Sequence, residues 1–89
     1  MSRGLYFTPS AWKDYLYWTT QDKKTLKRLN KLIQSSLRTP FEGIGKPESL
    51  MGELTGYWSR RIDDKHRLVY RVTDTTIDVI QCRDHYGDK

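Results

Sequence analysis

The residue types that could carry out chemistry lie in the second half of this 89-residue chain. Glu48 offers a carboxylate in a Gly/Pro-rich loop, and Arg67 offers a guanidinium at the start of an expected strand. His85 and Tyr86 follow one another near the C-terminus. Cleavage of an RNA phosphodiester without a metal requires a base for the 2′-hydroxyl, a cation for the phosphate and an acid for the departing 5′-oxygen. The chain contains each type, and we expect these groups to converge at one edge of a sheet.

Each of these residues also has an ordinary structural interpretation. Glu48 can be a plain loop acid, Arg67 one of several surface arginines, and His85 part of a frayed terminus. An acid/base pair of His66 with His85 is an alternative, but His66 falls in an expected turn, where we expect it only to cap a hairpin. No Asp, Glu or His cluster has the spacing of metal ligands, so we expect neither a metal nor a cofactor.

Two helices are predicted to precede the strands that carry these groups. Residues 5–7 form a short apolar run that indicates a first strand, and Thr8 is the expected N-cap of a helix ending near Thr20. Asp22 is expected to cap a second helix, which ends at Arg38 because Thr39 precedes a proline. Its apolar stripe consists of Leu26, Leu29, Ile33 and Leu37, and its opposite face of Lys23, Lys24, Lys27, Arg28 and Lys31.

The rest of the chain alternates loops and strand-like runs. Residues 41–56 hold four of the six glycines, so we expect a loop with at most one short strand, near Met51 to Leu54. Runs at 57–62, 67–73 and 76–84 predict an antiparallel meander. We therefore expect one α+β domain spanning residues 1–89, in the order β-α-α-β-β-β, with two N-terminal helices packed on a small, mainly antiparallel sheet.

The register of the first hairpin decides which side chains share a face of that sheet. A turn at Asp64-Lys65 would place Ile62 opposite Arg67, Arg60 opposite Val69 and Trp58 opposite Arg71. Three arginines and a Trp would then share one face, which is a suitable platform for single-stranded RNA. The face toward the helices would collect Tyr57, Leu68, Tyr70, Val72, Ile77 and Val79.

Composition narrows the possible partners and compartment. The chain has 16 Lys+Arg against 11 Asp+Glu, a formal net charge of +5 that attracts polyanions. No apolar stretch approaches the roughly 20 residues of a spanning helix, and the N-terminus lacks the apolar segment of a secretory signal. Cys82 is the only cysteine, so no internal disulfide can form, and we interpret it as a core residue. We expect a cytoplasmic protein without membrane contact.

Six segments together resemble the YoeB-type toxins of the RelE/ParE superfamily. The resemblance covers essentially the whole chain, in order and with matching spacing, which makes it more specific than any single motif. The segments are residues 12–18 (WKDYLYW), 38–43 (RTPFEG), 45–48 (GKPE), 56–62 (GYWSRRI), 66–70 (HRLVY) and 82–86 (CRDHY).

The resemblance implies a role for each candidate. Glu48 would be the general base, Arg67 the cation that stabilises the phosphate and His85 the general acid, while Tyr86 would position the substrate or assist proton transfer. It implies RNA or ribosome contacts at three further basic residues, namely Lys46, Arg60 and Arg61. Strict strand alternation would turn His85 away from Arg67, so a bulge or loss of strand geometry near Asp84 is required.

The resemblance also implies partners and leaves alternatives open. It predicts cleavage of mRNA in the A site of the 70S ribosome, a homodimer, and neutralisation by an acidic antitoxin of the YefM type. One alternative is a toxin of the same fold that blocks a protein such as DNA gyrase without cutting RNA. The other is a basic RNA-binding module without catalysis.

Overall fold

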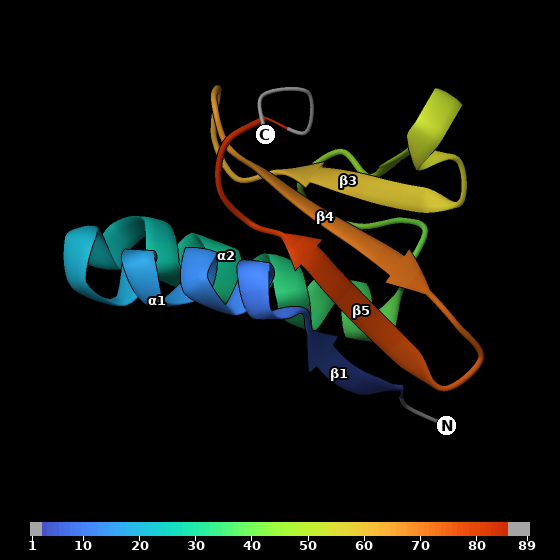
Figure 1. Cartoon of the computed structure of the whole chain (residues 1–89), viewed down its shortest axis with the longest axis horizontal. Coiled ribbons are helices and arrows are strands. Elements are labelled where there is room, and N and C mark those ends of the chain that lie inside the picture. Colours follow the sequence, from blue (N-terminus) through green and yellow to red (C-terminus); the bar gives the residue numbers. More distant parts are fainter. Residues whose placement is uncertain (1–2, 86–89) are drawn as a thin grey trace.

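The computed structural model describes residues 3–85. In chain order the elements are β1 (Gly4–Phe7), α1 (Pro9–Gln21), α2 (Lys23–Arg38), β2 (Glu48–Ser49), a 3-10 turn (Gly52–Leu54), β3 (Tyr57–Arg61), β4 (Arg67–Val72) and β5 (Thr76–Gln81). After the short strand β1 come the two helices, and the remaining strands follow (Figure 1). The predicted α+β order is confirmed, with a short extra strand in the loop before β3.

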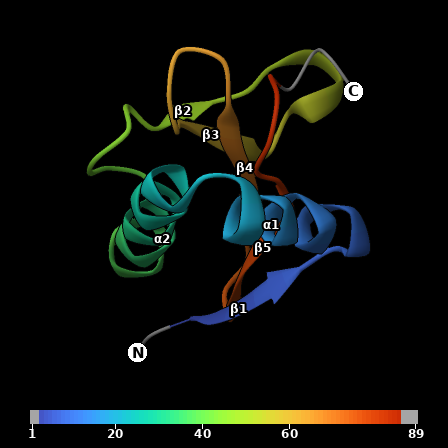
Figure 2. The same ribbon diagram turned by 90° about the vertical axis from the view of Figure 1, so that its left-hand side faces the viewer.

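The strands form one sheet in the order β1-β5-β4-β3-β2. Strands β2 to β5 pair antiparallel, and β1 pairs parallel with β5 at the other edge. Residues of both helices pack in one core cluster with Leu68 and Tyr70 of β4, so both helices cover the same face of the sheet, and Figure 2 shows α1 and α2 next to one another. We call the opposite side of the sheet the outer face. Among residues 3–85, no helix combines the length and apolar character needed to cross a membrane.

Local capping sets where the two helices begin. The hydroxyl of Thr8 accepts a hydrogen bond from the Ala11 N–H at 3.1 Å, and Pro9 occupies the first helical turn. The carboxylate of Asp22 accepts from the N–H groups of Lys24 and Thr25, each at 3.1 Å. The hydrogen bonds to its carboxylate lower the pKa of Asp22, chiefly the one from the backbone N–H of Thr25. Both predicted N-caps are confirmed.

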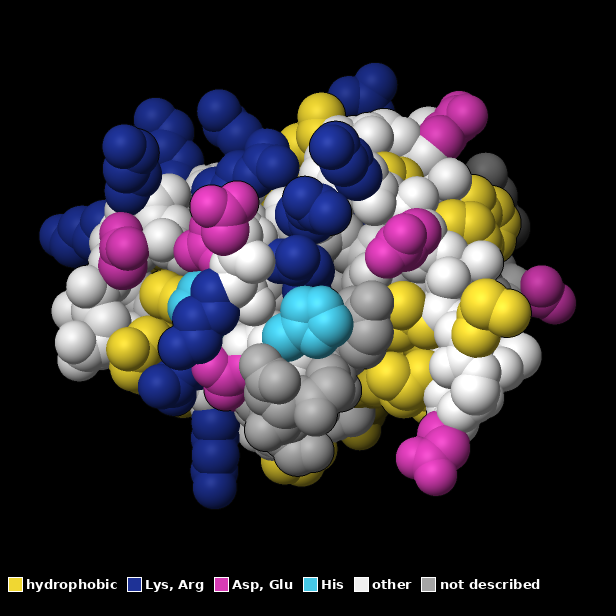
Figure 3. All heavy atoms as spheres, turned by 90° about the horizontal axis from the view of Figure 1, so that it is seen from above, with side chains coloured by type: hydrophobic (Ala, Val, Ile, Leu, Met, Phe, Trp, Pro, Cys, Tyr) yellow, Lys and Arg dark blue, Asp and Glu magenta, His cyan; other side chains and the backbone are white. Residues whose placement is uncertain are grey.

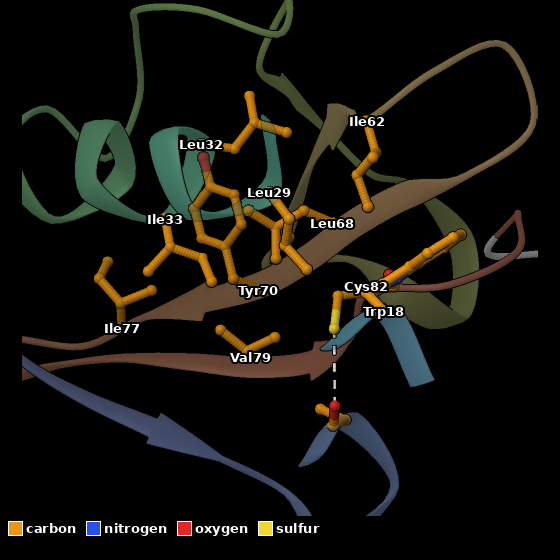
Figure 4. Close-up of a cluster of buried hydrophobic side chains, with 11 residues drawn as sticks. Trp18, Leu29, Leu32, Ile33, Ile62, Leu68, Tyr70, Ile77, Val79 and Cys82 are labelled. Carbon is orange, nitrogen blue, oxygen red and sulfur yellow. Dashed lines mark hydrogen bonds between the residues drawn. The ribbon is translucent and has the colours of Figure 1, made fainter. Parts of the chain in front are cut away.

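The core lies between the helices and the inner face of the sheet (Figure 4). Leu29 and Leu32 of α2 face Leu68 and Tyr70 of β4, and all are at most 1% exposed. Figure 4 also shows Cys82, whose thiol contacts the carbonyl of Ala11 at 3.5 Å. The predicted core role of Cys82 is confirmed, and it joins the end of β5 to α1.

The predicted hairpin register is wrong by one residue. The observed pairs are Tyr57 with Arg71, Ser59 with Val69 and Arg61 with Arg67. The carboxylate of Asp63 accepts from the N–H groups of Lys65 and His66, and the Ile62 N–H donates to the His66 carbonyl. The loop is therefore the three residues 63–65 instead of a two-residue turn, and a slip of one residue exchanges the faces of the strand.

The slip moves two aromatic residues to the side opposite to the predicted one. Trp58 lies opposite Tyr70 on the inner face and packs against Phe41, with ring centroids 5.0 Å apart. Tyr57 lies opposite Arg71 on the outer face. The predicted strand near Met51 to Leu54 is also wrong, because Gly52–Leu54 form a 3-10 turn and the strand in this loop is Glu48–Ser49.

A candidate active site on the outer face

The corrected register places Glu48 and Arg67 on the same face of the sheet. Glu48 pairs with Ser59, which pairs with Val69, and paired residues point to the same side. Arg67 lies two residues before Val69 along β4, so its side chain shares that side. From strand spacing and rise, the Cα atoms of Glu48 and Arg67 are roughly 12 Å apart, a span that the two side chains can close around one phosphate.

A second cation lies beside Arg67. Arg61 is its register partner on β3, and like charges directly opposite one another repel. Arg67 donates to the carbonyls of Asp63 at 2.6 Å and His66 at 3.1 Å, which hold the guanidinium at the hairpin. Within residues 3–85, neither arginine forms an ion pair with a carboxylate. An anion bound between them would relieve their repulsion.

Lys46 extends this positive charge toward Glu48. The carbonyl of the neighbouring Gly45 accepts from the Arg61 N–H at 2.7 Å, so the chain before β2 runs alongside the end of β3. The side chain of Lys46 is exposed there. Gly45 has φ +83, and an added Cβ would approach a methyl group of Leu32 to 2.6 Å, so only glycine fits this crossing.

The C-terminal arm, residues 82–85, brings His85 to the same end of the sheet. Ile80 is left unpaired in β5, because Val69 pairs with Gln81 and Tyr70 with Val79. The strand ends at Gln81, and Asp84 adopts φ +65. Of the two predicted alternatives near Asp84, the loss of strand geometry is present there, and the bulge lies earlier, at Ile80.

The arm is tied to β4 at Asp84, directly before His85. The Arg67 N–H donates to the Asp84 carbonyl at 3.0 Å, and the side-chain amide of Gln81 donates to the same oxygen at 3.2 Å. His85 therefore follows a residue bonded to the backbone of Arg67, and its side chain is half-buried. Tyr86 lies outside the described residues.

His66 contributes a contact that the sequence did not predict. Its Nδ1 accepts a hydrogen bond from the Asp84 N–H at 2.7 Å. The prediction of a hairpin cap is confirmed only for its backbone, whose carbonyl accepts from Ile62 and Asp63. The sequence offered one clue to the placement of His66. It directly precedes Arg67, and because neighbouring strand residues face opposite sides, its side chain is expected to point away from that of Arg67.

Arg60 is a structural residue, which corrects its predicted role in RNA contact. Its side chain is 0% exposed on the inner face. All five of its N–H donors are used, since it bonds to the hydroxyls of Tyr70 and Ser35 and to the carbonyls of Thr39, Glu42 and Ile44 at 2.7–3.0 Å. No donor remains for an RNA phosphate. Arg60 instead fastens the end of α2 and the loop that leads to Glu48.

The electrostatics of the outer face differ between its two ends. At the far end the guanidinium of Arg71 donates to Asp78 at 2.9 Å, and this carboxylate raises the pKa of Arg71. Figure 3 shows Lys and Arg side chains gathered around a histidine on the surface seen from above. Within the described part of the chain, no three His, Cys, Asp or Glu side chains come together as a metal-binding group would require. The candidate site, as far as the described residues form it, therefore offers cations, one carboxylate and one imidazole.

The element order and the five-stranded sheet define an α+β protein of the RelE-like class. A family model described as the YoeB-like toxin of bacterial type II toxin-antitoxin systems matches residues 7–86. The protein called Toxin YoeB in Mycobacterium bovis is 55% identical over 84 residues, which cover 94% of this chain and 99% of that protein. The chain therefore belongs to the YoeB-like toxin family, within the RelE/ParE superfamily.

Solved structures agree with this assignment. The YoeB dimer from Staphylococcus aureus superposes with a TM-score of 0.87 at 48% identity, covering 94% of this chain and 98% of that one. The heterotetrameric YoeB-YefM toxin-antitoxin complex from the same organism gives a TM-score of 0.86 at 48% identity, with the same coverage.

Proposed function

We propose that this toxin is a ribosome-dependent endoribonuclease, which cleaves mRNA in the ribosomal A site by metal-independent acid/base catalysis and so inhibits translation in the cytoplasm. The observation that carries the proposal is the register that puts Glu48 and Arg67 on one face, with His85 next to a residue bonded to Arg67. These three groups have the types that an internal attack on a phosphodiester requires.

The proposed reaction uses the 2′-hydroxyl of the substrate as nucleophile. The carboxylate of Glu48 takes the proton of the 2′-hydroxyl, and the 2′-oxygen forms a bond to phosphorus. The bond from phosphorus to the 5′-oxygen then breaks, and His85 donates a proton to the departing oxygen. The products are a 2′,3′-cyclic phosphate and a 5′-hydroxyl, and Tyr86 is proposed to position the substrate.

Positive charge supports the phosphorane-like transition state. The planar guanidinium of Arg67 stays charged and can contact two phosphate oxygens at once. Arg61 and Lys46 are exposed beside it and are proposed to bind the RNA backbone on either side of the cleaved bond. Because the guanidinium of Arg67 donates its hydrogen bonds to neutral carbonyls, its charge is not cancelled by them.

We further propose that the toxin forms a homodimer and is neutralised by an acidic antitoxin of the YefM type. The support is the similarity to the YoeB dimer and to the YoeB-YefM heterotetramer of Staphylococcus aureus. An acidic partner would compete for the field around Arg61 and Arg67, either by covering them or by displacing the segment that carries His85.

The decisive experiment maps RNA ends. Purified protein is incubated with translating ribosomes, with and without a chelator, and the ends of the message are identified chemically. The expected result is cleavage within the A-site codon, unchanged by the chelator, that leaves 2′,3′-cyclic phosphate and 5′-hydroxyl ends. Loss of cleavage with the chelator would overturn the metal-independent scheme.

Two other outcomes would favour the alternative functions. Intact message together with inhibited DNA gyrase would indicate a toxin that acts on a protein target. Intact message with binding that weakens in Arg67→Ala would indicate an RNA-binding module without catalysis.

A further inference from the structure

We propose that His66 is a positioning residue, which holds the backbone of Asp84 and thereby fixes the direction in which His85 leaves the sheet. The inference rests on the proposed function, because it assigns His66 a part in presenting the candidate general acid. His66 itself does not touch the substrate in this scheme, since it lies on the side of β4 opposite to Arg67.

Asp84 is bonded through both of its backbone polar groups. Its N–H donates to Nδ1 of His66 at 2.7 Å, while its carbonyl accepts from the Arg67 N–H at 3.0 Å. Its φ of +65 lies in the left-handed region, which a residue with a side chain adopts only at a cost. The hydrogen bonds with His66 and Arg67 therefore hold a conformation that the isolated segment would rarely adopt, and His85 follows directly from it.

His66 is itself held in place through both its ring and its backbone. Its ring meets that of Trp18 edge to face, with centroids 4.8 Å apart, and its side chain is only 15% exposed. Its backbone N–H donates to the Asp63 carboxylate at 2.7 Å. Because the Asp84 N–H is a donor, Nδ1 must supply a lone pair, which leaves the proton of a neutral ring on Nε2.

The arm is also held on its α1 side, so His66 completes a two-sided attachment. The indole N–H of Trp18 donates to the Cys82 carbonyl at 2.8 Å, and the guanidinium of Arg83 lies 3.6 Å from the centre of the Tyr17 ring. These contacts end at Arg83. At Asp84 the backbone is bonded to His66 and Arg67, and the side-chain amide of Gln81 donates to the same carbonyl at 3.2 Å, directly before His85.

Two substitutions separate the acceptor of His66 from its ring. In His66→Asn the side-chain oxygen branches from Cγ as Nδ1 does, so it can accept from Asp84 while the contact with Trp18 is lost. In His66→Phe the ring contact remains while the acceptor is lost. A residue that acted only by packing would tolerate Phe better than Asn, whereas the proposal predicts the reverse order.

The test compares wild type, His66→Asn, His66→Phe and the exposed control Asp64→Asn. Single-turnover cleavage of ribosome-bound message is measured together with hydrogen exchange of the Asp84 amide and thermal stability. We expect His66→Phe to lower kcat about 10- to 100-fold with KM little changed, because a displaced acid acts only on the reacting state. The Asp84 amide should exchange faster in His66→Phe, and both properties should remain close to wild type in His66→Asn and Asp64→Asn.

The possible failures are distinguishable. If wild type cleaves and His85→Gln abolishes cleavage, yet His66→Phe cleaves as wild type does, the inference is wrong and the proposed function stands. A loss of activity in His66→Asn as large as in His66→Phe also overturns it, because the retained acceptor then has no effect. If wild type cleaves no message under any condition, the proposed function fails and the inference fails with it, even if hydrogen exchange shows that His66 protects the Asp84 amide.

Discussion

Trp18 and Cys82 are 64 positions apart in the chain, yet the indole Nε1–H of Trp18 donates to the carbonyl of Cys82 at 2.8 Å. This bond joins α1 to the first residue of the C-terminal arm, directly after β5 ends. Both residues are buried, at 5% and 0% exposure. The first helix therefore has a part in the candidate site although none of its residues is a candidate for catalysis.

Removing this donor should destabilise the fold measurably. Trp18→Phe keeps an aromatic ring but leaves the Cys82 carbonyl without the indole donor, which costs about 1–3 kcal/mol of unfolding free energy. Each kcal/mol lowers Tm by roughly 4–8 °C in a domain of this size. Trp12→Phe is the matched control, because Trp12 is 48% exposed and Phe can keep its stacking on Tyr15. Equal melting temperatures for the two variants would contradict the assignment.

Substitution by lysine should destabilise the protein much more at Arg60 than at its neighbour Arg61. Arg60→Lys replaces five buried hydrogen bonds with at most three and should lower the unfolding free energy by about 2–4 kcal/mol. Arg61→Lys alters an exposed side chain and should change stability by no more than about 0.5 kcal/mol. Denaturant unfolding of both variants measures the difference. A tolerated Arg60→Lys would show that the buried contacts do not need a guanidinium.

Local sequence signals were enough to predict the helices. In contrast, which face of the sheet each β3 side chain occupies depends on the length of the loop between β3 and β4. Thr8 and Asp22 specify their caps through residues two or three positions away, so the chain sequence alone locates both helix starts. The register of β3 and β4 depends on whether two or three residues close the hairpin, and Asp63 decides this by accepting from Lys65 and His66. The length of this loop decides whether Arg60 or Arg61, and whether Trp58 or Tyr57, lies on the outer face of the sheet.

Two features of the candidate site could not be obtained from the sequence pattern. Residues Glu48–Ser49 form a strand only because they pair with β3, since Pro47 and the surrounding glycines favour a loop. Strand alternation predicted a departure from strand geometry near Asp84, but the direction of the chain at His85 depends on the unpaired Ile80 and on the left-handed Asp84, which arise from contacts between distant segments. The resemblance to YoeB-type toxins supplied the set of residues, and the structure supplied their arrangement.

The cap of α2 should make stability depend on pH in the acid range. The pKa of Asp22 is lowered from its ordinary value of 3.8 in the folded chain, so its ionised form stabilises the folded state. This contribution is fully present above the ordinary value and is lost as pH falls through the lowered folded pKa. Thermal unfolding of wild type and Asp22→Ala should differ at neutral pH and converge in strong acid. A difference independent of pH would show that charge at the cap is unimportant.

Glu48→Gln tests the proposed base without changing the size of the side chain. The amide cannot take a proton from the 2′-hydroxyl, so kcat for cleavage of ribosome-bound message should fall about 10²- to 10⁴-fold. Stability should be unchanged, because Glu48 is exposed on the outer face. Glu53→Gln is the matched control, since this exposed carboxylate lies in the 3-10 turn, and it should cleave at the wild-type rate. A rise in KM with unchanged kcat would show instead that Glu48 only binds substrate, and another group would then have to accept the proton.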